Sequence, residues 1–294
     1  MRIGVTGASG FVGRRLVPSL CAAGHQVVRI GRGRDADVPW DPAAGRLDAA
    51  ACAGIDAFVH LAGANVGERW TTAHRRAIRD SRVHGTALIA RTAAALAPRP
   101  RVLVCASAVG VYGDAGKVVC DEGTPPGADF LAEVCRQWEA SADAAVQARI
   151  RTVHLRFGVV LSREGGALAR MLPLFRAGAG GRLGSGRQWM SWLSMDDALA
   201  IVRFALDTDA MSGAVNAVAP APVTNAEFTA VLANVVRRPA VLPVPAFMLQ
   251  LAFGEMARGT LLASQRAVPR ALLAAGYAFR HATLEPALRA AVCQ

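Results

Sequence analysis

The sequence predicts an α/β protein in which helices cover both faces of a doubly wound parallel sheet, with a smaller C-terminal lobe. Two observations carry this prediction. Apolar, strand-like runs alternate with helical segments as far as residue 161, which is the pattern of a parallel sheet with crossover helices. Beyond residue 161 this alternation gives way to glycine-rich and proline-containing segments. The second part of the chain is therefore expected to form the smaller lobe.

Each element has a local justification. The run 152–161 is almost wholly apolar, as expected of a strand buried on both faces. Pro18 should bend or shorten the first helix, and Asp196 and Asp197 open a later helix, where capping is a better explanation than catalysis. The glycine-rich segment 178–192 is expected to be a mobile loop over a cleft. The remaining strands are expected at residues 3–5, 26–30, 55–63 and 101–106, with an exit loop at 107–113, and helices at 69–96, 130–148 and 196–206.

The most specific motif is the glycine-rich run that follows the first strand, Gly7-Ala8-Ser9-Gly10-Phe11-Val12-Gly13. A strand that turns through glycines into a helix directs backbone N–H groups and the positive helix end at one point, which suits a dinucleotide pyrophosphate. A tight turn without a ligand is the competing interpretation. We predict a Rossmann-type dinucleotide-binding domain over residues 1–161 and a substrate lobe over residues 162–294, with residues 192–218 returning to the main sheet.

The end of the second strand predicts which dinucleotide binds. NAD sites usually carry an acidic residue there for the ribose 2′-hydroxyl, but this chain reads Gly31-Arg32-Gly33-Arg34. A guanidinium at Arg32 suits the 2′-phosphate of NADP, because its fork of donors stays charged. Asp35 and Asp37 could reverse that preference, and Arg32 could also be a solvated surface residue.

Composition limits the remaining function classes. The formal net charge is +11, but Lys117 is the only lysine and the arginines are scattered along the chain. We therefore expect no nucleic-acid partner. The sequence has no apolar run of membrane-spanning length and no leader, so we expect no membrane contact and a cytoplasmic location. The six cysteines lack metal-ligand spacing, which predicts reduced thiols and no metal, and the long helices could support a homodimer.

The chain resembles the extended short-chain dehydrogenase/reductase family, which includes sugar-nucleotide epimerases and dehydratases. The resemblance rests on the glycine turn, Leu61-Ala62-Gly63 and Val111-Tyr112-Gly113. The chain is more narrowly similar to an epimerase-like, NADP-binding branch with a short C-terminal domain. The motifs that match this branch are Trp70, Ser81-Arg82, Trp138-Glu139, Gly186-Arg187-Gln188, Trp192, Asn216-Ala217-Val218-Ala219-Pro220, Gly254-Glu255, Ser264-Gln265 and Pro269.

The resemblance implies cofactor contacts beyond the glycine turn. They are the clamp Arg32, the strand end Leu61, Ala62 and Gly63, and the side chains of Arg82 and Val159. For Arg82 a surface ion pair is an equally good interpretation.

The family's catalytic tyrosine and the lysine four residues after it are absent. A phenol needs such a positive neighbour to act as a base near neutrality. The positions aligned with this pair hold Leu131 and Cys135. The remaining candidates for handling a proton are Ser107, Tyr112 and a group on the loop 178–192. For Ser107 and Tyr112, structural roles are the alternative.

Two functions therefore stay open. The first is an epimerase-like oxidoreductase that uses NADP(H) on a small polar substrate; the second is a non-catalytic, NADP(H)-dependent binding or regulatory protein. The residues expected to contact the substrate favour the first function. They are Arg156, Arg187, Gln188 and Trp192.

Overall fold

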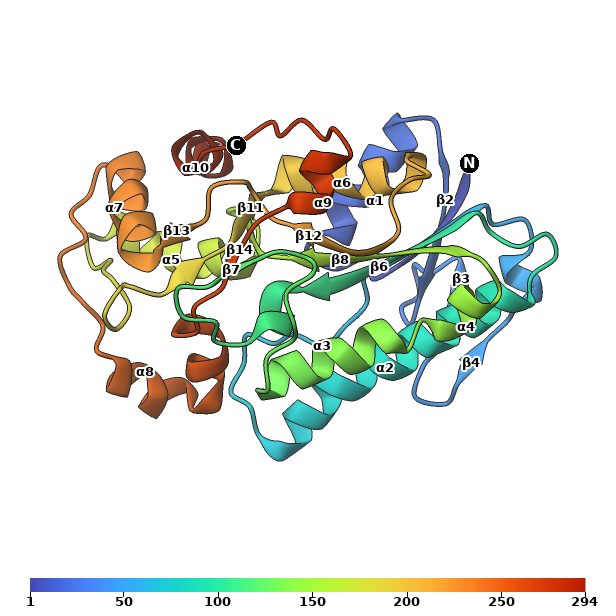
Figure 1. Ribbon diagram of the computed structural model, residues 1–294, viewed down its shortest axis with the longest axis horizontal. Helices are drawn as coiled ribbons and strands as arrows, with labels where there is room; N and C mark the ends of the chain where they lie inside the picture. The colour runs from blue at the N-terminus through green and yellow to red at the C-terminus, as the bar shows by residue number, and fades with distance from the viewer. Residues whose placement is uncertain (294) are drawn as a thin grey trace.

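The computed structural model describes the backbone of residues 1–293 and the side chains of residues 1–292. Within this range the chain forms an eight-stranded sheet in the order β12-β8-β6-β5-β1-β2-β3-β4 (Figure 1). Its neighbouring strands are parallel except for β3 and β4, so the predicted parallel sheet is confirmed. The strands are β1 Arg2–Thr6, β2 Gln26–Gly31, β3 Val38–Asp41, β4 Arg46–Leu47, β5 Ala57–His60, β6 Val102–Ala108, β8 Arg151–Phe157 and β12 Gly213–Ala217.

Helices cover both faces of this sheet. Alternate residues of a strand point to opposite faces, so Ile3 and Val5 pack with one group of helices, whereas Phe58 and Leu103 pack with the other. The first group is α1 Gly13–Ala22, α6 Met195–Asp207 and α9 Arg270–Ala274, and the second is α2 Thr72–Ala95, α3 Phe130–Ala140 and α4 Asp143–Gln147 (Figure 1). The two apolar cores fix the sheet between these layers.

Two predicted elements are divided in the structure. The expected strand 152–161 divides at Gly158 into β8 and β9 (Val159–Leu161). At Gly158 the chain passes so close to Ser191 that a Cβ atom would overlap the Ser191 backbone, which only glycine avoids. The expected helix 130–148 divides at Ser141, whose hydroxyl donates to the Trp138 carbonyl at 2.6 Å. By contrast, α1 continues through Pro18 as one helix from Gly13 to Ala22, although the sequence predicts a bend or a shorter helix there.

The C-terminal lobe is built around a separate apolar core that contains Trp192 and Phe228. Part of the segment expected to be a loop forms short strands that pair with distant residues. β12 lies beside β8 at the edge of the main sheet, while the domain boundary itself stays a prediction. The other helices are α5 Gly166–Arg176, α7 Asn225–Val236, α8 Ala246–Phe253 and α10 Leu284–Cys293, and single helical turns lie at Ala50–Cys52, Val109–Tyr112 and Ala257–Leu261. The remaining strands form three pairs: β9 with β11 (Trp192–Ser194), β10 (Trp189–Met190) with β13 (Val223–Thr224), and β7 (Val119–Cys120) with β14 (Arg266–Ala267).

Asp197 joins the lobe to α6. Ser194 is the N-cap of this helix, and its hydroxyl accepts the N–H of Asp197 at 3.0 Å. The Asp197 carboxylate is fully buried and accepts the Tyr277 hydroxyl and the N–H groups of Arg280 and His281. Asp197 therefore holds the segment before α10 against the sheet layer.

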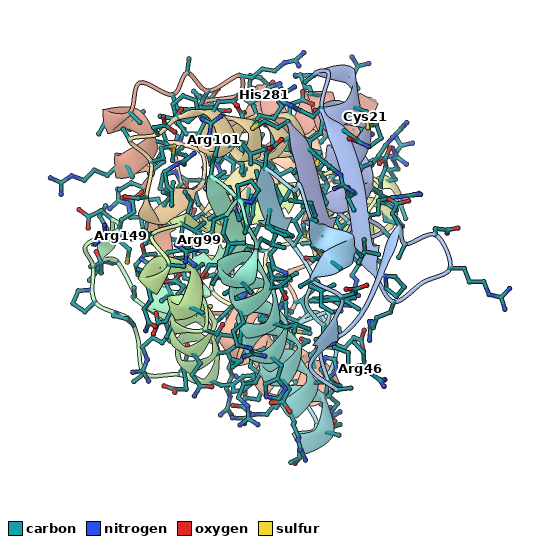
Figure 2. All side chains as sticks on the ribbon, turned by 90° about the vertical axis from the view of Figure 1, so that its right-hand side faces the viewer. Cys21, Arg46, Arg99, Arg101, Arg149 and His281 are labelled. Atoms are coloured by element: carbon teal, nitrogen blue, oxygen red, sulfur yellow. The ribbon has the colours of Figure 1, made fainter. Side chains whose placement is uncertain are left out.

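Charged side chains are spread over the surface. In Figure 2, Arg149 lies on the left of the molecule and Arg46 at the lower right, with Arg99 labelled between them. Across residues 1–293, no helix combines the length and the apolar character needed to cross a membrane.

Candidate functional site

The glycine turn between β1 and α1 leaves backbone N–H groups free. Gly7 directly follows β1 and has a φ of 68°. The N–H of Gly10 donates to the Gly7 carbonyl at 2.9 Å and closes the turn. A Cβ atom at Gly13 would overlap the Gly7 carbonyl, so only glycine allows the helix to begin there. Within residues 1–292 no hydrogen bond uses the N–H groups of Phe11 or Val12, and α1 has no side-chain N-cap. Unbonded donors at the start of a helix suit an anion, and we call residues 7–13 the cradle.

Arg32 follows β2 at the same edge of the sheet. Its side chain is exposed and makes no ion pair with any other described residue. Asp37 is already bound, because the Arg29 side chain donates to its carboxylate at 3.0 and 3.1 Å. These hydrogen bonds, and one from the Arg29 N–H, hold the pKa of Asp37 below its ordinary value. A guanidinium is therefore available for a 2′-phosphate, and one of the two acids that could oppose it is engaged elsewhere.

The end of β5 approaches the glycine turn closely. A Cβ atom at Gly7 would lie 2.8 Å from the Leu61 carbonyl carbon and 2.9 Å from the Ala62 nitrogen. Beside them, the Arg82 guanidinium carbon would lie 3.2 Å from a Cβ atom at Gly63. Only small residues allow such close contact between the strand end, the turn and the guanidinium.

Arg82 is held in place by carbonyl groups rather than by an acid. Its Nη1 donates to the carbonyls of Ala64 and Ile78 at 3.0 Å, and its guanidinium lies 4.9 Å from the Trp138 ring centre. Burial lowers the pKa of this guanidinium from its very high ordinary value, although it stays a cation at neutral pH. Arg82 is therefore not in a surface ion pair with any described residue.

The remaining cofactor candidates lie nearby. Val159 begins β9 and is half-buried. The Phe11 ring packs against Gly165 and Gly166 at the start of α5, where a Cβ atom at either glycine would crowd the ring. The structure thus gathers the glycine turn, the end of β5 and the start of β9 at the carboxyl edge of the sheet, where ligands of doubly wound folds bind.

Ser107 belongs to a buried charged network. Its hydroxyl donates to Glu139 Oε1 at 2.6 Å. Arg156 donates to both oxygens of the same carboxylate, from Nε at 2.9 Å and from Nη2 at 2.8 Å. Burial alone raises the pKa of Glu139, but the hydrogen bonds from Arg156 and Ser107 outweigh it and keep that pKa below its ordinary value. Glu139 is therefore a fixed anion and a weak base.

Tyr112 is bound at the other end of Arg156. Its hydroxyl lies 2.7 Å from Asn216 Oδ1, to which it donates, and accepts Arg156 Nη1 at 3.1 Å. Only 4% of the residue is exposed. Burial raises the pKa of Tyr112 despite the nearby guanidinium. This arrangement favours a structural role for the hydroxyl, and the predicted catalytic roles of Ser107 and Tyr112 stay predictions.

The positions of the missing tyrosine–lysine pair are apolar in character. Leu131 and Cys135 both lie next to Gly110, because a Cβ atom there would be 3.5 Å from Leu131 Cβ and 3.9 Å from Cys135 Sγ. Burial raises the pKa of Cys135 to about 12, so this thiol stays protonated at neutral pH. Neither side chain can take over proton transfer from the pair it replaces.

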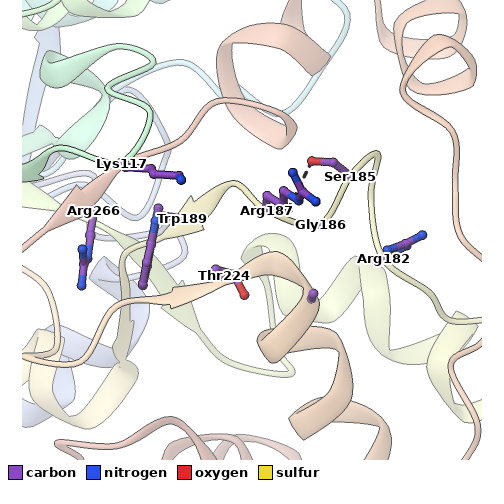
Figure 3. Close-up of a pocket in the computed structure, with 9 residues that line it drawn as sticks. Lys117, Arg182, Ser185, Gly186, Arg187, Trp189, Thr224 and Arg266 are labelled. Atoms are coloured by element: carbon purple, nitrogen blue, oxygen red, sulfur yellow. Dashed lines mark hydrogen bonds between the residues drawn. The ribbon is translucent and has the colours of Figure 1, made fainter.

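A cavity of about 420 Å³ lies between the C-terminal lobe and the loop that carries Lys117 (Figure 3). Of the four predicted substrate contacts, Arg187 alone lines it. Gln188 is buried and donates to the carbonyls of Leu183 and Leu261. Trp192 is fully buried in the core of the lobe. Arg156 is also buried, in its network with Glu139. The residues lining the cavity are Lys117, Arg182, Ser185, Gly186, Arg187, Trp189, Thr224, Ala226 and Arg266.

Several functional positions are not evident from the sequence. Glu139 matches the family motif, but its partners Arg156 and Ser107 lie on other elements. Lys117, Arg187 and Arg266 are far apart in the sequence and line one cavity. The only sequence signal for this cavity is that Lys117 is the single lysine of an arginine-rich chain. Among the described residues, no cluster of three or more His, Cys, Asp or Glu side chains could hold a metal ion.

The strand order and the glycine turn define a Rossmann-type α/β protein. Residues 3–217 match the NAD dependent epimerase/dehydratase family, and residues 244–291 match a domain of unknown function (DUF1731). The chain belongs to the NAD dependent epimerase/dehydratase family, which confirms the resemblance found in the sequence.

Individual relatives cover the whole chain. An epimerase family protein of Mycobacterium bovis is 43% identical over 290 residues, which are 97% of this chain and 96% of that protein. The crystal structure of human epimerase family protein SDR39U1 with NADPH is 33% identical, with a TM-score of 0.88 and 99% of both chains covered. MoeE5 in complex with UDP-glucuronic acid and NAD shares the fold at 22% identity, with a TM-score of 0.78 over 98% of this chain and 96% of MoeE5.

Proposed function

We propose that the chain is an NADP(H)-binding, epimerase-like oxidoreductase that acts on a small polar substrate. The observation that carries the proposal is the cradle at the start of α1, where the N–H groups of Phe11 and Val12 are unbonded and Gly13 admits no side chain. Such a cradle fits a pyrophosphate. The NADPH in the crystal structure of the related human protein supports the same assignment.

Arg32 is the proposed clamp for the 2′-phosphate of NADP. It is exposed, lies directly after β2 and makes no ion pair with a described residue. A guanidinium can donate two hydrogen bonds to one phosphate. Leu61, Ala62, Gly63 and Val159 would wall the cofactor.

Arg82 would provide a buried positive charge beside the cofactor, next to Gly63 at the end of β5. Its Nη1 is fixed by two carbonyl groups, so the guanidinium is already oriented before a ligand arrives. When bound, NADPH supplies a hydride. The chain's own residues would orient the cofactor and exclude water from it.

The source of the proton is the open part of this proposal. Ser107 and Tyr112 are the candidates from the sequence, but each hydroxyl already donates inside the protein, to Glu139 and to Asn216. Polar groups on the segment 178–192 are the remaining candidates. The same observation supports a second function, in which the chain binds NADP(H) without turnover and acts as a binding or regulatory protein.

The cofactor assignment is tested by calorimetric titration with NADPH and NADH. We expect NADPH to bind more tightly, and we expect Arg32→Ala to remove the preference. A charge-assisted pair of hydrogen bonds is worth about 1.5–3 kcal/mol, or roughly 10- to 150-fold in affinity. Arg34→Ala removes the same charge two residues away and should keep the preference. An unchanged preference in Arg32→Ala would refute the clamp.

Turnover distinguishes the two functions. The NADPH-bound protein is mixed with a panel of small carbonyl compounds, and the loss of NADPH absorbance is followed. Steady oxidation with any compound supports the oxidoreductase, whereas tight binding without oxidation across the panel supports the binding protein.

A cytoplasmic location is also part of the proposal. The structure gives five cysteines as free thiols, as in a reducing compartment: Cys21, Cys52, Cys105, Cys120 and Cys135.

A further inference from the structure

The cavity between the C-terminal lobe and the loop that carries Lys117 is surrounded by cationic side chains from three segments. Lys117 comes from the loop before β7, Arg182 and Arg187 come from the segment before β10, and Arg266 comes from β14 (Figure 3). The volume of about 420 Å³ is that of a small-molecule site. The lining residues include no carboxylate.

These four cations have no acidic partners within residues 1–292. Many other arginines of the chain do: Arg15 pairs with Glu164 at 2.9 Å, and Arg75 pairs with Glu255 at 2.6 Å. Around the cavity, by contrast, none of the four is in an ion pair with a described residue. Cations gathered around a cavity without compensation create a positive potential that attracts anions.

The acidic residues and the helix end near the cavity are already engaged in hydrogen bonds. Asp114, three residues before Lys117, accepts the N–H groups of Ser264 at 3.1 Å and of Gly116 at 3.3 Å. Glu227, in the first turn of α7, is bound inside that helix's capping box, where it accepts the N–H and hydroxyl of Thr224. The N–H groups of Asn225 and Ala226 donate to the carbonyls of Gln188 and Gly186. The start of α7 therefore offers no free N–H at these two positions, and the cationic side chains must do the binding.

One of the four cations is held rigidly. The Arg266 guanidinium lies 4.1 Å from the centre of the Trp189 ring, which stacks against it and also lines the cavity. Arg266 is further fixed by the pairing of β14 with β7. A guanidinium that is ordered before binding loses less conformational freedom when it meets an anion.

We propose that this cavity binds a small organic polyanion, with two or more anionic oxygen groups such as phosphates or carboxylates. Lys117 and Arg187 contact one end of the ligand and the stacked Arg266 contacts another. The cavity shares no lining residue with the glycine turn, and binding there needs no hydride transfer, so it can be tested whether or not the chain turns over NADPH.

The probes are inorganic pyrophosphate and citrate, titrated calorimetrically into the full-length protein after saturation with NADPH, so that the cofactor cradle is filled. We expect saturable binding of one equivalent of at least one probe, with affinity that falls as NaCl is added. Pyrophosphate binding alone identifies a phosphate ligand, citrate binding alone a carboxylate ligand, and binding of both supports the shared chemistry. Absence of binding by both probes at millimolar concentration overturns the proposal.

The decisive variant is Lys117→Gln with Arg187→Gln, because both side chains are exposed and neither forms an ion pair with a described residue that folding would lose. We expect at least a tenfold loss of probe affinity with an unchanged melting temperature. The matched control, Arg46→Gln with Arg91→Gln, removes the same charge far from the cavity and should change affinity less than twofold. An equal loss in both double variants means a general charge effect and refutes the site.

A short DNA duplex is the third titrant. If the duplex binds at least as tightly as the probes, and the Lys117→Gln, Arg187→Gln variant weakens it equally, the cavity belongs to a nucleic-acid surface and the small-molecule proposal is wrong. If the duplex binds weakly and the variant affects the small probes alone, the proposal stands.

Discussion

Replacing Arg156 with methionine tests whether the network around Glu139 is a stabilising core element. Arg156 and Glu139 form a bidentate ion pair at 2.8 and 2.9 Å, and their side chains are only 9% and 15% exposed. Methionine keeps the apolar stem and removes the charge, so Glu139 stays buried without its cation. Removing one partner of a buried pair costs about 3–5 kcal/mol.

The expected change in melting temperature follows from the size of the chain. An unfolding entropy of about 2.1 cal/mol/K per residue over 294 residues corresponds to about 0.6 kcal/mol per degree. The loss therefore predicts a melting temperature lower by about 5–8 °C at pH 7 in scanning calorimetry. As a control, Arg46→Met breaks the exposed pair with Asp41 and should leave the melting temperature nearly unchanged.

The pH dependence gives a second measurement on the same variant. In the wild type the pKa of Glu139 is lowered on folding, so its contribution is present above the unfolded value near 4.3 and is lost as the pH falls through the folded value. Without Arg156, burial dominates and raises the folded pKa, so the variant loses stability as the pH rises through that value. The difference between the two proteins should be largest at pH 7 and should shrink toward pH 4.

Two outcomes would refute this reasoning. A change of less than 1 °C at pH 7 would mean that water solvates Glu139 in the native protein. A large loss that is the same at pH 4.5 and pH 7 would mean that the cost comes from packing rather than charge. The double variant Arg156→Met, Glu139→Gln should recover part of the loss, because neither charge remains buried.

Three further substitutions test other assignments. Gly13→Ala would force a methyl group onto a backbone carbonyl of the turn, and we expect it to abolish NADPH binding in calorimetry; an unchanged dissociation constant would contradict the cradle. Tyr112→Phe removes the hydroxyl that joins Asn216 and the buried arginine, and we expect a loss of about 1–3 kcal/mol in urea unfolding with intact NADPH binding. A specific loss of turnover at full stability would instead make Tyr112 catalytic. Asp197→Asn weakens the attachment of residues 277–281, so amide exchange there should quicken while the main sheet stays protected, and uniform protection would count against the attachment.

The features that sequence could predict are those that neighbouring residues determine. The glycine turn is one, because Gly7 and Gly13 meet within a single loop. The division of the strand at Gly158 could not be predicted, since the group that excludes a side chain there belongs to Ser191, more than thirty residues away. The short strands in the segment 178–192 pair with equally distant residues.

The same distinction separates the cofactor cradle from the substrate candidates. The sequence predicts Arg156, Gln188 and Trp192 as substrate contacts because their polar or aromatic side chains suit a cleft, but residue type does not determine which way a side chain points. The structure turns Arg156 toward Glu139 and Gln188 toward backbone carbonyls, while Arg187, the neighbour of Gln188, lines the cavity. Adjacent residues with similar polarity thus face opposite directions, and only tertiary contacts decide between them.

The position of Arg82 gives a physical reason for a small neutral side chain at residue 135, the position that the sequence comparison with the wider family aligned with its lysine. The Arg82 guanidinium is held by the carbonyls of Ala64 and Ile78, and it is close enough to the Cys135 thiol to act on its pKa. An ammonium group in place of that thiol would put two cations together in a buried space, where like charges repel strongly. A small neutral side chain at 135 avoids that cost. The buried cation beside residue 135 therefore comes from α2, and the neutral thiol at this position is compatible with it.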